Sequence, residues 1–84
     1  MNNKILVRII SPHFNNSYDV FIPVNEYVGV VIDLIIKILK DLSGNEFIDK
    51  KAYSLINKDT GMIYDFGTII RETDIKNASE LILL

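Results

Sequence analysis

The sequence contains no cysteine among its 84 residues. That absence excludes disulfide bridges, cysteine-based zinc sites, thiol catalysis and iron–sulfur clusters. A strong charge of either sign is also lacking, because the basic and acidic residues nearly balance to a formal net charge of −2. This balance argues against nucleic acid or an anionic membrane as the main partner. Apolar residues make up 49% of the chain and charged residues 24%, which is typical of a folded globular protein.

Long uncharged apolar runs are missing as well. The most apolar stretch, residues 28–42, is interrupted by Asp33, Lys37, Lys40 and Asp41, so it lacks the ~20 apolar residues of a membrane-spanning helix. The N-terminus has neither the longer apolar core nor the small-residue cleavage site of a signal peptide. We therefore expect a cytoplasmic protein that does not insert into a membrane.

The spacing of apolar and turn residues predicts an α+β fold in one domain, residues 1–84. β-Branched runs separated by turn residues predict a hairpin, and the apolar stretch that follows predicts one long helix ended by Ser43-Gly44-Asn45. The expected elements are strands over 4–10 and 18–24, the helix over 28–42, strands over 52–56 and 80–84, a short returning strand over 62–64, and a loop with one helical turn over 66–74. This order suggests a helix packed across one face of a mixed sheet.

Several segments resemble one bacterial family. The run Val28-Gly29-Val30-Val31-Ile32-Asp33-Leu34-Ile35 resembles the helix of the YukD/EsaB family, which comprises small ubiquitin-like proteins linked to type VII (ESX-like, WXG100-exporting) secretion. The other segments similar to that family are Ser17-Tyr18-Asp19-Val20, Ile56-Asn57-Lys58-Asp59, Asp74-Ile75-Lys76-Asn77 and Glu80-Leu81-Ile82-Leu83-Leu84. The resemblance covers nearly the whole chain and rests on a pattern of strand, helix and turn signals.

The resemblance implies a ubiquitin-like β-grasp fold and a non-enzymatic accessory or regulatory role in a type VII-like secretion system. It implies protein partners, among them subunits of the secretion machinery. One departure lies in the turn before the last strand, where family members often carry glycine and this chain has Ala78. We expect Asn77 to adopt the positive φ there, because asparagine tolerates it.

Two other functions are open at this point. A conjugable ubiquitin-like modifier needs a flexible tail ending in Gly-Gly, and this sequence stops at Leu84 in an apolar strand, so that function needs a longer native C-terminus. The tripeptide Asp59-Thr60-Gly61 matches the active-site tripeptide of aspartic peptidases, which a dimer of short chains can build from one aspartate each. Asp-x-Gly is also common turn chemistry. No spacing of ligands predicts a metal or a cofactor.

Strand alternation predicts an apolar sheet face turned away from the helix. A solvent-exposed sheet face that binds no partner would carry more charged residues and more threonine. Scattered surface apolar residues in an isoleucine-rich chain are the alternative, but a contiguous apolar patch usually binds a partner. We therefore predict a protein-binding surface formed by Leu6, Arg8, Ile10, Phe21, Ile82 and Leu84.

The helix carries more apolar surface than packing on one sheet requires. At ~100° per residue the polar positions form a stripe of roughly 120°, and all other positions are apolar. Val30 and Leu34 lie on one flank of the buried side, and Ile32 and Ile36 lie on the other. These flanks predict a second protein interface, either with another protein or between two copies of this chain in a homodimer. The alternative is that residues 45–50 and the loop over 66–74 cover them.

Overall fold

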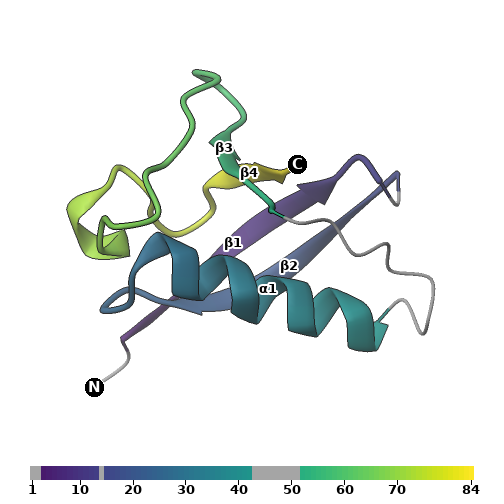
Figure 1. Cartoon of the computed structure of the whole chain (residues 1–84), viewed down its shortest axis with the longest axis horizontal. Coiled ribbons are helices and arrows are strands. Elements are labelled where there is room, and N and C mark those ends of the chain that lie inside the picture. Colours follow the sequence, from purple (N-terminus) through teal and green to yellow (C-terminus); the bar gives the residue numbers. More distant parts are fainter. Residues whose placement is uncertain (1–2, 14, 43–51) are drawn as a thin grey trace.

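The structure, a computed structural model, describes residues 3–13, 15–42 and 52–84. One helix lies across one face of a mixed sheet of four strands (Figure 1). In the strand order β2-β1-β4-β3, β1 and β4 are parallel and the other neighbours are antiparallel. The elements are β1 (Lys4–Ser11), β2 (Asn16–Pro23), α1 (Val28–Leu42), β3 (Leu55–Asn57), the 3₁₀ turn η1 (Ile70–Glu72) and β4 (Glu80–Leu83). The predicted α+β class is confirmed.

The predicted elements agree with the structure apart from the bounds of the strands and the short returning strand. The helix has the predicted bounds, and the single helical turn falls inside the predicted loop. β2 starts two residues before the predicted position because the hairpin pairs as far as Ser11 and Asn16. β3 is shorter than predicted, and the returning strand is reduced to one bridge between Ile56 and Ile63. The predicted helix stop at 43–45 lies outside the described residues.

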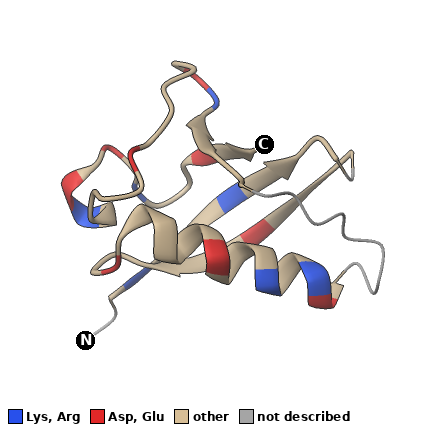
Figure 2. Ribbon diagram, in the orientation of Figure 1, with Lys and Arg blue, Asp and Glu red and all other residues tan. Residues whose placement is uncertain are grey.

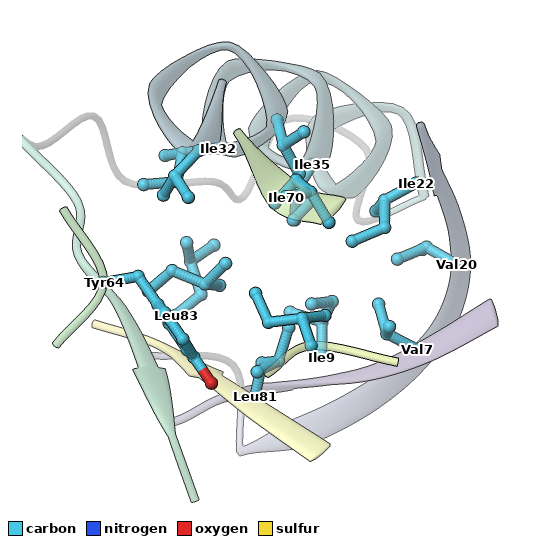
Figure 3. Close-up of a cluster of buried hydrophobic side chains, with 14 of the residues drawn as sticks. Val7, Ile9, Val20, Ile22, Ile32, Ile35, Tyr64, Ile70, Leu81 and Leu83 are labelled. Atoms are coloured by element: carbon cyan, nitrogen blue, oxygen red, sulfur yellow. The ribbon is translucent and has the colours of Figure 1, made fainter. Parts of the chain in front are cut away.

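The core lies between α1 and the inner face of the sheet (Figure 3). Along each long strand every second side chain is buried, as the period of a strand with one buried face requires. α1 contributes a buried stripe at helical spacing. The buried hydrophobic residues of the four strands and α1 are Val7, Ile9, Val20, Ile22, Val28, Val31, Ile32, Ile35, Leu39, Leu55, Leu81 and Leu83. The alternation also leaves the opposite sheet face free of the helix.

The turn before β4 departs from the sequence prediction. Ala78, not Asn77, has the positive φ, at 72°. Asn77 serves a different purpose, since its Oδ1 accepts a hydrogen bond from the Leu6 N–H at 2.9 Å. The Ala78 N–H donates to the Leu6 carbonyl at 2.8 Å, so both residues bind the turn to β1. The expectation for Asn77 was wrong because these two bonds decide which residue turns the chain.

We expect Ala78→Gly to raise the free energy of unfolding by about 1 kcal/mol, because alanine in the left-handed region is strained and glycine is not. Gly61 provides the matched control. It has a φ of 75°, and a Cβ added there meets no atom within 4 Å. Gly61→Ala should therefore lower the free energy of unfolding by a similar amount, through backbone strain alone. Urea unfolding measures both. A loss of stability in Ala78→Gly would contradict the strained turn.

Candidate protein-binding surface

The sheet face opposite α1, here called the outer face, carries the residues predicted for protein binding. Three of them are exposed apolar side chains: Leu6 at 39%, Phe21 at 59% and Leu84 at 46%. Arg8 is also exposed, and the remaining two, Ile10 and Ile82, are half-buried. Each of these six residues has at least one immediate neighbour that is buried. The predicted side of the sheet is therefore right for all of these residues, and their use in binding stays a prediction.

A row of alternating charge crosses the middle of the outer face. Arg8 on β1 lies opposite Asp19 on β2 and also opposite Glu80 on β4. Lys58 directly follows β3, and its N–H donates to the Glu80 carbonyl at 3.2 Å. In strand order the four side chains are acidic, basic, acidic and basic, and we call them the charged row. Figure 2 shows charges of both signs on neighbouring strands of the sheet.

Two ion pairs hold the charged row together. Arg8 Nε lies 3.1 Å from Asp19 Oδ1, and Lys58 Nζ lies 3.5 Å from Glu80 Oε2. The hydrogen bond to Asp19 raises the pKa of Arg8, so the arginine charge is constant. All four side chains are substantially exposed, so each pair stabilises the fold little. Their charges remain accessible to a partner.

The charged row divides the apolar residues of the outer face into two patches. On one side, the register places Ile10 beside Ile82 and Ile82 beside Ile56. We call these three residues the isoleucine patch. On the other side Phe21 lies opposite Leu6. The predicted surface contained one charged residue, Arg8, and the strand register adds Asp19, Glu80 and Lys58 beside it.

The flanks of α1 differ from each other. Val30 and Leu34 are exposed, at 42% and 41%. Ile32 is only 4% exposed and belongs to the core, and Ile36 is half-buried against the core. The prediction of Ile32 as an interface residue was therefore wrong, and the second candidate surface is reduced to one flank.

The loop after residue 65 contacts the start of α1. Gly29 donates its N–H to the Phe66 carbonyl at 3.1 Å. A Cβ at Gly29 would lie 3.4 Å from Phe66 Cβ, so the absence of a side chain permits the close approach. The expectation that the loop over 66–74 covers part of the helix agrees with this contact. Residues 45–50, the other expected cover, lie outside the described residues.

The tripeptide Asp59-Thr60-Gly61 forms a turn. Asn57 Oδ1 accepts hydrogen bonds from the Asp59 N–H at 2.8 Å and the Thr60 N–H at 3.1 Å. Gly61 has positive φ and donates its N–H to the Asn57 carbonyl. Asp59 is exposed, whereas an aspartic peptidase needs two carboxylates sharing a proton in a rigid, buried loop. The geometry matches the turn reading of this motif.

A buried tyrosine forms a polar cluster that the sequence analysis missed. The Tyr64 hydroxyl donates to Asp74 Oδ1 at 2.5 Å and accepts a hydrogen bond from Asn57 Nδ2 at 3.0 Å. Burial, together with the bond to Asp74, raises the pKa of Tyr64 to about 12. The cluster joins the end of β3 to the segment before β4. Its partners are up to 17 residues apart in sequence, so no local pattern predicts it.

Metal ligation and membrane insertion were also considered for the described residues. Among residues 3–13, 15–42 and 52–84, no group of three or more His, Cys, Asp or Glu side chains is placed to hold a metal ion. No helix in the same part of the chain is long and apolar enough to cross a membrane.

Comparison with known proteins rests on structure alone, since no protein-family model matches the chain and no curated protein matches its sequence. The EccD5 ubiquitin-like domain from Mycobacterium xenopi aligns with a TM-score of 0.80 and 17% identity, over 99% of this chain and 94% of that domain. The ubiquitin-like domain of the Mycobacterium tuberculosis type VII secretion system protein EccD1 aligns with a TM-score of 0.75 and 14% identity, over 100% and 99% of the two chains.

A longer chain also matches. A chain of the MycP5-free ESX-5 inner membrane complex aligns with a TM-score of 0.79 and 17% identity over 99% of this chain. This chain spans only 21% of the length of that one. These similarities establish the fold. The fold expected from the family resemblance is therefore confirmed. The chain has the ubiquitin-like β-grasp fold.

Proposed function

We propose that this protein is a non-enzymatic protein-binding module of a type VII-like secretion system, acting in the cytoplasm as an accessory or regulatory component. The YukD/EsaB resemblance supports this role, and so does the fold shared with the ubiquitin-like domains of secretion proteins. The function needs only a surface that recognises another protein. We assign that role to the outer face.

The exposure of Phe21 is the observation that carries the proposal. This aromatic side chain is 59% exposed within a regular strand. It lies opposite Leu6, which is itself 39% exposed. Large apolar side chains beside exposed charges are typical of binding hot spots with a polar surround. The isoleucine patch adds apolar surface on the other side of the charged row.

We expect Phe21→Asp and Ile82→Asp to reduce partner binding at least tenfold, because each places an unpaired charge in an apolar contact. Neither change should unfold the domain, since Phe21 is exposed and Ile82 is half-buried on the outer face, outside the core. Affinity capture from the native host with a tag at Met1, followed by mass spectrometry, measures binding. Circular dichroism checks folding. Leu34→Asp, on the exposed helix flank, is the matched control and should leave capture unchanged.

Three outcomes decide the proposal. Recovery of secretion-machinery membrane subunits or their small helical substrates, lost in Phe21→Asp and kept in Leu34→Asp, supports it. Recovery of unrelated proteins would refute the secretion role. If Phe21→Asp or Ile82→Asp unfolds the domain, that residue belongs to the core and the surface is not as described.

A further inference from the structure

The order of charges in the charged row has a symmetry property. Across strands β2, β1, β4 and β3 the row reads Asp19, Arg8, Glu80 and Lys58. Reversing the strand order turns acidic, basic, acidic, basic into basic, acidic, basic, acidic. The reversed row is therefore complementary to the original at every position.

A twofold axis produces this reversal when two copies meet through their outer faces. The axis lies in the plane of contact, runs parallel to the strands and passes between β1 and β4. It places β1 over β4 of the second copy and β2 over β3 of the second copy. Arg8 then faces the other Glu80, and Asp19 faces the other Lys58. A twofold axis perpendicular to the strands would instead place like charges opposite each other, which is unfavourable.

The same rotation also pairs apolar residues close to the axis, on β1 and β4. Ile10 and Ile82 occupy neighbouring positions on β1 and β4. Ile10 of one copy therefore faces Ile82 of the second copy, and Ile82 faces Ile10. Leu6 faces Ala78 of the second copy, because these two residues are joined through the Ala78 N–H and the Leu6 carbonyl. The charged row is thus bordered by apolar contacts on both sides, as in an isologous interface.

We propose that the outer face pairs with the outer face of a second copy of this chain through this twofold arrangement. The proposal rests on the proposed use of the outer face as a protein-binding surface. The four strands lie about 4.8 Å apart and rise about 3.3 Å per residue, so their eight, eight, three and four residues give a face of roughly 360 Å². Standard interfaces bury about 800 Å² per partner. The dimer is therefore weak, with a Kd of about 10 μM or higher, and it weakens further at high salt.

Charge reversal tests the pairing by sedimentation equilibrium. Arg8→Glu and Glu80→Arg each place two like-charge contacts in the homodimer, so each variant alone should associate at least tenfold more weakly than the wild type. In an equimolar mixture the two variants are complementary at every position of the row, and association should return. Both side chains are exposed, at 52% and 38%, so both variants should fold. Lys37→Glu on α1 is the control for net charge.

The outcomes separate this proposal from the proposed function. A wild type that is monomeric up to about 1 mM, or a mixture no more associated than its components, overturns the dimer. If Phe21→Asp still loses captured secretion proteins in that case, the proposed function stands without self-pairing. A dimer restored in the mixture, with capture unaffected by Phe21→Asp, supports self-pairing and refutes the proposed function.

Discussion

Leu81→Ala is expected to destabilise the protein by about 2–5 kcal/mol, enough to unfold much of it under native conditions. Leu81 is fully buried, between α1 and the sheet, and its truncation leaves a cavity. A small domain has little stability to lose, because it buries a modest fraction of its surface. Urea denaturation followed by circular dichroism measures the change.

The next residue along β4 supplies the matched control. Ile82 has a similar volume but is half-buried on the outer face, so Ile82→Ala should lose less than half as much stability as Leu81→Ala. Equal losses in the two variants would contradict the alternation that separates the core from the outer face. A larger loss in Ile82→Ala would place the core on the wrong side of the sheet.

Stability should fall by up to about 2 kcal/mol between pH 10 and pH 12 because of Tyr64. Its pKa is about 12 in the folded protein and about 10 in an unfolded chain. In this window the unfolded chain releases the hydroxyl proton while the folded chain keeps it. The contribution is therefore fully present below pH 10 and is lost as the pH rises through the folded value.

Tyr64→Phe isolates this effect from the other groups that titrate at high pH. The variant loses the hydrogen bonds to Asp74 and Asn57, so it should be about 1 kcal/mol less stable near neutral pH. Its stability should decline less steeply than that of the wild type between pH 10 and pH 12. The urea midpoint of each protein is measured from pH 10 to pH 12. An equal decline of the midpoint in the variant and the wild type would show that the Tyr64 hydroxyl does not make the described hydrogen bonds.

Local periodicity was sufficient to predict most of the fold. The helix over 28–42 has a wide apolar stripe, and its bounds were predicted correctly. The strand ending at Leu83 and both hairpin strands alternate clearly, so their buried and exposed sides were also predicted correctly. These signals depend on neighbours within a few residues, which a single sequence contains.

Features that depend on strand register could not be predicted in this way. The charged row requires Arg8 to lie between Asp19 and Glu80, and the parallel pairing of β1 with β4 decides this. Burial of Ile32 depends on how α1 is turned against the rest of the core, which periodicity along α1 alone does not show. The φ of Ala78 likewise follows from its bond to β1.

The most direct test of the outer face as a binding surface is site-specific photocrosslinking in the native host. A photoreactive amino acid replaces Phe21 in one variant and Leu34 in another, because both side chains are exposed but lie on opposite sides of the molecule. The account predicts covalent protein adducts from position 21 and none from position 34. Adducts from position 34 alone would contradict it and would assign binding to the helix flank.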